Sequence, residues 1–358
     1  MRPQAMQVFV DNADMVGNPS ALHSSGRAAK ALLEDARESL ATDVGAHPSE
    51  VVFTSGGSEA DSIAVLGARR TGRDRVLVSA IEHPAVGAAA QRGLAEVIGV
   101  TRSGVVALDE LTDRLDETVA LVSVMSVNNE TGIIQPVEEV AAAARRVGAW
   151  THTDAVQALG RLPLDFASSG VDALSLSAHK VGGPVGIGAL LVRRDVTLAP
   201  LGLGGGQERE LRSGTQPALL AASFAAAVRA AVAERDALNQ RLAGYFAQIA
   251  AALHRIGGVR LNTTGQHVPH VLNATFDAIR ADDVLVLLDR AGIDASVGSA
   301  CRAGVHRPIA VLLAMGRDET AASASLRFSM GHSTTQADVD ALLAGLPDAV
   351  ASARRAFD

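Results

Sequence analysis

The strongest constraint on the fold is an alternation of short apolar segments with amphipathic stretches between residues 51 and 195. The apolar segments are rich in Val, Leu and Ala, as buried strands are, and the stretches between them have the length of helices. This order predicts an α/β fold whose large domain holds a mostly parallel sheet with helices on both faces. We expect strands near 51–54, 76–79, 119–126, 149–153, 172–177 and 187–193, and helices at about 58–70, 84–92 and 137–147.

A second, smaller α+β domain is expected after the glycine-rich loop at 202–214. Pro217 begins a long stretch rich in Ala, Leu and Arg, which predicts a helix to about residue 254. The elements expected beyond it are strand 271–276, helix 281–290, strand 293–297, helix 307–315, strand 325–329 and helix 335–353. We assign residues 12–235 to the large domain, and residues 1–11 and 236–358 to the small one.

Composition excludes several classes of protein. The longest apolar stretch, 218–228, has about half the length that a bilayer requires, and the first residues lack the pattern of a signal peptide, so we expect a cytoplasmic protein without membrane contact. A net charge of −7 over 358 residues argues against direct binding of nucleic acid. A single cysteine, Cys301, excludes internal disulfides and a cysteine-cluster metal site, and we expect no metal.

Five of the predicted strands end in polar or glycine-rich segments. Ligands of an open α/β sheet bind at the carboxyl ends of its strands, so these segments form the candidate site. The first is a Ser-Gly-Gly-Ser-Glu turn at 55–59, where free N–H groups favour a phosphate, although a Gly-Gly turn is more often only a turn. The others carry His83, the Asn-Asn-Glu run at 128–130, Asp154 with Gln157, and Ser177 with His179 and Lys180. Each of these residues also has an ordinary structural interpretation. A single histidine is more often structural than catalytic, Asn and Glu are common in turns, and Asp before a helix commonly caps it.

The lysine is the most specific of these signals. The chain has two lysines among its 32 Lys and Arg residues, and one of them, Lys180, follows an apolar strand and precedes a glycine-rich segment. We expect buried surroundings there, which make an amine a nucleophile toward carbonyl groups. A Schiff-base lysine points to pyridoxal phosphate, for which the other strand ends supply matching groups. Asp154 would hold the ring nitrogen protonated, His83 would stack on the ring, Asn129 and Gln157 would reach its phenolic oxygen, and the turn at Ser58 would bind the phosphate.

The only cysteine lies in the segment GSACRAG at 298–304. A free cysteine is more often a small buried hydrophobic residue, but the polar and glycine-rich sequence favours a mobile loop with a reactive thiol at Cys301. Arg302 and His306 lie near it in the sequence and would increase its thiolate fraction.

Together these motifs resemble the cysteine desulfurases of the NifS/IscS type, in the class-V group of fold-type I pyridoxal-phosphate enzymes. The resemblance runs in one order over nearly the whole chain, which argues against chance similarity. The matching segments are VDNA (10–13), GNPSALHSSGR (17–27), FTSGGSEAD (53–61), EHPAV (82–86), NNETG (128–132), HTDAVQALGRLPLD (152–165), SAHKVGGPVGIGAL (177–190), GGGQERELRSGTQ (204–216), GSACRAG (298–304) and SLRFSMG (325–331).

The resemblance implies a role for each matching residue. Lys180 would hold the cofactor, and Thr215 would reach the site of the other subunit in a homodimer. Arg327 would pair with the carboxylate of L-cysteine through its two-pronged guanidinium, and Asn12 and Asn129 would also contact the substrate. The phosphate ligands would be Gly57, Ser58, Ser177 and His179, and the catalytic residues Lys180, His83 and Cys301.

The implied reaction converts L-cysteine to L-alanine. Lys180 would remove the Cα proton, a kind of transfer that is typically worth about 10² to 10⁴ in rate. His83 would donate or accept a proton, and Cys301 would take the sulfur as a persulfide. A sulfur-acceptor protein, in iron–sulfur cluster assembly or a thio-modification pathway, would then receive it.

One segment departs from the family pattern. Asp14–Val16 joins Ala13 directly to Gly17, where family members carry several more helical turns near the entrance of the active site. A non-catalytic scaffold is therefore an alternative. A second alternative is a selenocysteine lyase or C–S lyase of the same fold, which would not need the thiol.

Overall fold

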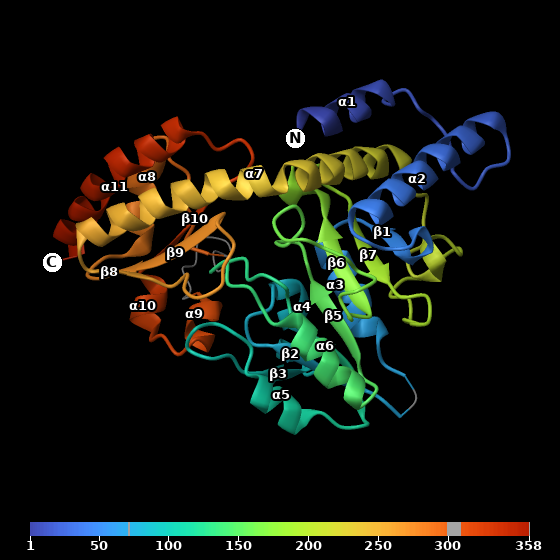
Figure 1. Ribbon diagram of the computed structural model, residues 1–358, viewed down its shortest axis with the longest axis horizontal. Helices are drawn as coiled ribbons and strands as arrows, with labels where there is room; N and C mark the ends of the chain where they lie inside the picture. The colour runs from blue at the N-terminus through green and yellow to red at the C-terminus, as the bar shows by residue number, and fades with distance from the viewer. Residues whose placement is uncertain (71, 299–308, 358) are drawn as a thin grey trace. The chain divides into compact units, whose positions relative to one another are not determined.

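The computed structural model describes residues 1–70, 72–298 and 309–357, which form two compact units (Figure 1). The first comprises Met1–Ile98, Val106–Ser126 and Gln135–Arg235, and the second Gly99–Val105, Val127–Ile134 and Asp236–Asp358. Residues 1–11, which we grouped with the small domain, lie instead in the first unit. Arg2 holds them there, because its Nε donates to the Val181 carbonyl at 2.7 Å and its Nη1 pairs with Glu234 at 2.6 Å.

A seven-stranded sheet forms the centre of the first unit, in the order β1-β7-β6-β5-β4-β2-β3. Only β7 runs antiparallel to its two neighbours, so the prediction of a mostly parallel sheet is confirmed. The short strand β3 was not predicted. The strands are β1 Val51–Thr54, β2 Arg75–Ser79, β3 Glu96–Ile98, β4 Val119–Ser123, β5 Trp150–Asp154, β6 Ala173–Ser177 and β7 Gly188–Val192.

Helices cover both faces of this sheet. Because strand side chains alternate between faces, Val76 and Val78 of β2 join one apolar cluster and Leu77 joins the other. Fully burying such a side chain is worth roughly 1.5–3 kcal/mol. The cluster of Val76 includes α3 Gly57–Gly67 and α4 Pro84–Gln91, and the cluster of Leu77 includes α5 Leu108–Arg114 and α6 Val137–Arg146.

Two long helices complete the first unit, and the second of them continues into the other unit. They are α2 Ser24–Asp43, preceded by α1 Pro3–Asp11, and α7 Ala218–Ile256, whose residues from Asp236 onward belong to the second unit. Arg37 of α2 forms a buried pair with Glu208 at 2.7 Å, and Glu208 also accepts the Phe53 N–H of β1. This pair fixes the glycine-rich loop to the first strand. The short 3₁₀ turns are Pro48–Glu50, Ala178–Val181 and Glu208–Glu210.

The second unit packs helices on an antiparallel sheet of order β10-β9-β8. Its core joins Leu272 and Phe276 of the sheet with Leu242 of α7 and Leu346. The strand predicted at 293–297 was wrong, because only Ser296 pairs, in an isolated bridge with Arg327. The elements are β8 Val259–Leu261, β9 Val271–Phe276, α8 Ala281–Arg290, α9 Ala310–Ala314, α10 Glu319–Ser323, β10 Ser325–Ser329 and α11 Gln336–Phe357.

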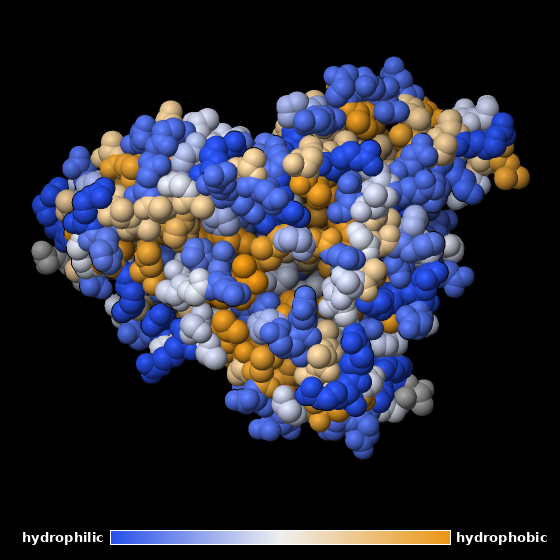
Figure 2. All heavy atoms as spheres, viewed as in Figure 1, coloured by the Kyte–Doolittle hydropathy of each residue, from blue (hydrophilic) through white to orange (hydrophobic). Residues whose placement is uncertain are grey.

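The surface mixes hydrophilic residues with smaller groups of hydrophobic ones, as Figure 2 shows for one face. Four strongly exposed apolar side chains, Val16, Leu22, Val185 and Leu203, all lie in connections of the first unit. None of the described helices combines the length and the apolar character that crossing a bilayer requires.

Candidate functional site

The ends of three strands meet at the first turn of α3. A Cβ atom at Gly57 would lie 2.8 Å from Val156 Cγ2 and 3.5 Å from Ser177 Cβ, so a side chain there would clash. Gly57 follows β1, Val156 follows β5 and Ser177 ends β6. The candidate residues after these strands are therefore brought together, as the strand-end rule predicts.

The start of α3 is open to a ligand. Its N-cap residue, Gly56, is extended and provides no side-chain cap, and a Cβ atom there would meet nothing within 4 Å. Ser58, in the first turn, is exposed. The carboxylate of Glu59 accepts the N–H of Ser55. Uncapped N–H groups at a helix start bind anions, and a phosphate is suited to this position.

Asp154 lies at the end of β5 and is only 5% exposed. Its Oδ1 accepts the N–H of Val156 at 2.9 Å. Burial raises the pKa of Asp154 to about 6, while the Val156 N–H and the positive charge of Lys180 act to lower it. Asp154 and Lys180 therefore lie within electrostatic reach of each other.

Lys180 occupies the 3₁₀ turn Ala178–Val181 directly after β6. Our expectation of buried surroundings was wrong, because the buried strand ends at Ser177 and Lys180 itself is exposed. The neighbouring His179 forms a 2.9 Å hydrogen bond between its Nδ1 and Ser177 Oγ. Burial and the charge of Lys180 lower the pKa of His179, which favours a neutral imidazole there.

The other expected residues of the first unit are more scattered. His83 is half-buried and caps α4, since its Nδ1 accepts the N–H of Ala85 at 3.2 Å. Gln157 is half-buried in the turn after Asp154, and Thr215 is exposed after the glycine-rich loop. Asn12 ends α1, where its Nδ2 donates to the Val8 carbonyl at 2.9 Å.

In the second unit, Arg327 of β10 is held by an ion pair. Its Nη1 lies 3.1 Å from Glu130 Oε1 and 3.1 Å from the carbonyl oxygen of Asn129, and its Nη2 donates to Ser296 Oγ at 3.3 Å. The side chain of Glu130 is 1% exposed and that of Arg327 is 22% exposed. The structure thus brings Arg327 and Asn129 together, with Glu130 as a partner that sequence reasoning missed.

The Asn-Asn-Glu run owes its shape to Asn128. Its Oδ1 accepts three hydrogen bonds, from the N–H of Glu130 at 3.0 Å and from the N–H and hydroxyl of Thr131 at 2.9 and 3.0 Å. Asn129 Nδ2 donates to Glu130 Oε1 at 3.0 Å. Asn128 is therefore a turn former, and the turn aims Glu130 at Arg327.

Comparison with known proteins places these features in a family. Residues 3–342 match the model of aminotransferase class V. An IscS-like cysteine desulfurase of Mycobacterium tuberculosis is 44% identical, covering 99% of this chain and 95% of that protein. The chain belongs to the class-V aminotransferase family. The cysteine desulfurase NifS of Azotobacter vinelandii is 37% identical over 98% of this chain and 89% of its own length.

A solved structure supports the same family assignment. A NifS-like protein superposes with a TM-score of 0.91 at 31% identity, covering 98% of this chain and 96% of that one. The resemblance to NifS/IscS-type proteins and the fold-type I prediction are thereby confirmed. Cys301, with Arg302 and His306, lies outside the described residues.

Three ionisable residues of this class-V chain were missed by sequence reasoning although they lie in the first unit with Asp154. Asp61 is 1% exposed, Glu82 is 9% and His152 is buried completely. The sequence carried one signal that could have pointed to Asp61. Asp61 falls on the apolar face of α3, between Ala60 and Ile63, where a carboxyl group is costly unless it has a purpose.

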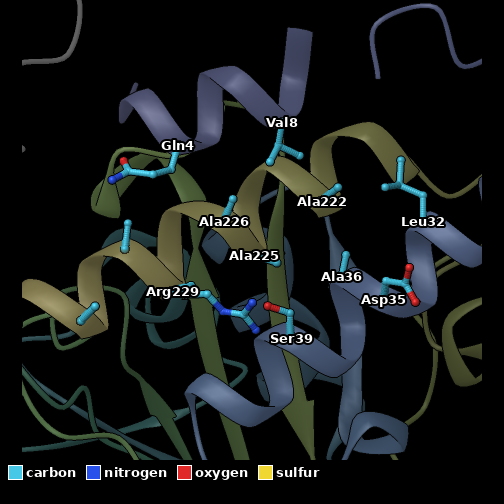
Figure 3. A pocket seen from close by; sticks show the side chains of 12 residues that line it. Gln4, Val8, Leu32, Asp35, Ala36, Ser39, Ala222, Ala225, Ala226 and Arg229 are labelled. Carbon is cyan, nitrogen blue, oxygen red and sulfur yellow. The ribbon is translucent and has the colours of Figure 1, made fainter. Parts of the chain in front are cut away.

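The first unit also has a groove that is lined by none of the candidate site residues and by none of Asp61, Glu82 and His152. Figure 3 shows it between α1, α2 and the first half of α7, with Val8, Ala222 and Ala225 among its lining side chains. Arg229 and Ser39 are among its few polar groups. The candidate site is therefore the strand ends and not this groove.

Proposed function

We propose that this chain is a cysteine desulfurase that uses pyridoxal phosphate. The observation that carries the proposal is that the Lys180 charge lies within electrostatic reach of the buried carboxyl group of Asp154, where three strands of the sheet end. A 44% identical relative over nearly the full length bears the name of a cysteine desulfurase.

The residues present fit the cofactor at three points. The helix start at Gly56 is open and uncapped, as a phosphate requires. Asp154 is a buried carboxyl group that can pair with a ring nitrogen, and Lys180 supplies the amine. Pyridoxal phosphate, when bound, supplies a carbonyl carbon for the amine and a ring that accepts electrons from the substrate Cα.

The side chains of the first unit have separate tasks in this proposal. Asp154 holds a proton on the ring nitrogen, and Lys180 takes the Cα proton from the substrate. His83 lies against the ring and exchanges a proton with the substrate, and Gln157 contacts a ring oxygen. The phosphate lies among Gly57, Ser58, Ser177 and His179.

The second unit binds the substrate and carries the sulfur acceptor. Arg327 meets the carboxylate of L-cysteine, and Asn129 adds a polar contact, as Asn12 of the first unit does. The thiolate of Cys301 attacks the substrate sulfur, so that the carbon–sulfur bond breaks and a sulfur–sulfur bond forms. L-cysteine and the thiol become L-alanine and a persulfide, with no other oxidant or reductant needed. An acceptor protein then receives the sulfur.

The proposal includes a homodimer and a location in the cytoplasm. Leu203, in the glycine-rich loop, is fully exposed, and Thr215 follows it on the same connection. A fully exposed leucine on the connection that carries Thr215, the residue expected to reach the other subunit, supports contact with a second copy. Sedimentation of the purified chain would give the mass of two copies, and a monomer would contradict the dimer.

Addition of pyridoxal phosphate and L-cysteine to the purified chain tests the proposal. We expect a visible absorbance of the bound cofactor and equal yields of alanine and sulfide in the presence of a reductant. Loss of alanine in Cys301→Ser supports the thiol as sulfur acceptor. A Cys301→Ala variant that retains full alanine production would favour a lyase instead, and cofactor binding without any alanine would favour a scaffold.

A further inference from the structure

A layer of ionisable side chains is buried around Asp154. It consists of Asp61 on α3, Glu82 after β2, and His152 and Asp154 on β5, and we call these four residues the acid layer. All four belong to the first unit. The hydroxyl groups of Ser79, Ser123 and Ser175 face the layer from β2, β4 and β6, and the charge of Lys180 acts on Asp154 from the turn after β6.

His152 is held in the layer as a neutral ring. Its Nδ1 lies 2.8 Å from Ser123 Oγ and its Nε2 lies 2.9 Å from Ser175 Oγ, so a hydroxyl satisfies each nitrogen. Burial lowers the pKa of His152 to about 3. Asp61 Oδ1 lies 3.6 Å from Nε2 and has no hydrogen-bond partner among the described residues. Within the described part of the chain, Asp61 therefore faces no cation that would hold it as an anion.

Glu82 is satisfied on one oxygen only. Its Oε1 accepts the hydroxyl of Ser79 at 2.6 Å and the N–H of Met125 at 2.8 Å. Its Oε2 is buried without a hydrogen-bond partner in the described part of the chain. Burial raises the pKa of Glu82 to about 8, and the charge of Asp154 adds to the increase. The free oxygen is the natural position for a proton.

The three carboxyl groups influence one another. Burial, then the charge of Asp154 and that of Glu82, raises the pKa of Asp61 well above its usual value. Several buried anions within reach of each other are unfavourable without matching cations, so protons are shared among them. Asp154 is the member that Lys180 stabilises as an anion. Among the described residues no three His, Cys, Asp or Glu side chains are placed to share a metal ion.

We propose that Asp61 and Glu82 are positioning residues that stay neutral within reach of Asp154 and leave it as the one carboxylate of the acid layer that would pair with the cofactor. Glu82 joins β2 to the residue Met125 after β4 through its hydrogen bonds, and Asp61 of α3 packs against His152 of β5. Their neutrality keeps Asp154 free to ionise. This inference deepens the proposed function and rests on its use of Asp154.

Infrared spectroscopy of the full-length chain without cofactor tests the protonation directly. At pH 7 the wild type should show the carbonyl stretch of protonated carboxyl groups. Asp61→Asn and Glu82→Gln should each lose part of that band, and the double variant should lose it. Glu96→Gln is the matched control, because Glu96 pairs with Arg75 at 2.7 Å and should leave the band unchanged. A wild type without the band, or variants that retain it, would overturn the proposal whatever the enzyme activity.

The pH dependence of cofactor binding tests the positioning role. As the pH falls, protonation of Asp154 should weaken the binding of pyridoxal phosphate, with a midpoint near its pKa of about 6. Asp61→Asn and Glu82→Gln should keep that midpoint, because each exchanges one neutral group for another. Asp61→Ala should weaken cofactor binding severalfold, while Asp61→Asn preserves it. A midpoint that shifts downward in the Asn and Gln variants would show that the native acids are ionised, and equal binding by Ala and Asn would show that Asp61 does not position Asp154.

Discussion

The acid layer of the first unit and the Glu130–Arg327 pair of the second bury carboxyl groups in opposite ways. In the first unit, the described groups that act on Asp61 and Glu82 are hydroxyl, N–H, imidazole and carboxyl groups and include no cation, and burial raises the pKa values of both residues. In the second unit, Glu130 is just as buried but meets the guanidinium of Arg327. A buried carboxyl group without a cation is neutralised by a proton, and one with a cation keeps its charge. The acid layer is thus suited to leave Asp154 as the carboxylate that pairs with a protonated ring nitrogen, and the Glu130–Arg327 pair supplies a guanidinium that can recognise an anion.

The largest expected effect comes from removing the cation that acts on Asp154. Lys180→Ala should abolish alanine formation, a loss of at least about 10²- to 10⁴-fold, since a positioned proton transfer is worth that much. The chain offers a matched control in Lys30→Ala, because Lys30 is its other lysine and is exposed on α2. The rate of alanine release is measured for both variants and compared with that of the wild type. Comparable rates in the two variants would remove Lys180 from the reaction.

Removal of the Arg327 guanidinium, which pairs with Glu130 in the second unit, should destabilise the fold. Arg327→Gln removes the guanidinium from the buried carboxylate of Glu130, and breaking a buried ion pair on one side typically costs about 3–5 kcal/mol. Denaturant unfolding of the chain measures the loss, and a second change, Glu130→Gln, should restore much of it. Arg229→Gln serves as the control, because the pair of Arg229 with Asp43 is largely exposed on the arginine side and should be worth less than about 1 kcal/mol. A similar loss of unfolding free energy in Arg327→Gln and Arg229→Gln would mean that the Glu130–Arg327 pair stabilises the fold no more than an exposed ion pair does.

A pH series separates the neutral acids from the charged pair. The pKa of Glu82 is about 8 in the folded chain against an ordinary 4.5, so the unfolded chain ionises first as the pH rises. The folded chain then binds more protons than the unfolded one, and the free energy of unfolding falls with increasing pH between these values. Between pH 5 and pH 7 this contribution amounts to about 2–3 kcal/mol. Thermal unfolding at both pH values should show a smaller fall for Glu82→Gln than for the wild type, and parallel curves would contradict the neutral state of Glu82.

The smallest expected effect concerns substrate affinity. Glu130 competes with a bound carboxylate for Arg327, so Glu130→Gln should lower the KM for L-cysteine severalfold, about 1 kcal/mol of binding. Glu130→Ala removes the hydrogen bonds as well and should raise KM, because Arg327 loses its orientation. Glu319→Gln, on α10, is the control in the same unit. If Glu130→Gln and Glu130→Ala change KM in the same direction, charge competition is not the cause.

The fold was most predictable where the periodicity of the sequence is strong. The bounds of β1, β9, α8 and β10 were predicted to the residue. Strand 293–297 failed because Gly292 and Gly298, with φ values of 75° and 88°, turn the chain at both ends and leave only Ser296 to pair. Strand β3 has three residues, with Val97 42% exposed, so its apolar pattern is weak. The N-terminal helices received no prediction.

The site was predictable as far as the strand-end rule reaches. That rule brought Gly57, Asp154 and Lys180 to one edge of the sheet. It could not reveal Glu82 or Glu130, because their roles depend on partners from other elements, such as the N–H of Met125 and the guanidinium of Arg327. Burial is likewise a tertiary property, which is why Lys180 proved exposed although the strand before it, β6, is buried.

Mass spectrometry of the protein after treatment with L-cysteine tests the proposed sulfur transfer most directly. The peptide that contains Cys301 should gain the mass of one sulfur atom, and a reductant should remove it. The gain should be absent in Lys180→Ala and in Cys301→Ser. A wild-type protein that forms alanine while the Cys301 peptide gains no sulfur would contradict the transfer to this cysteine.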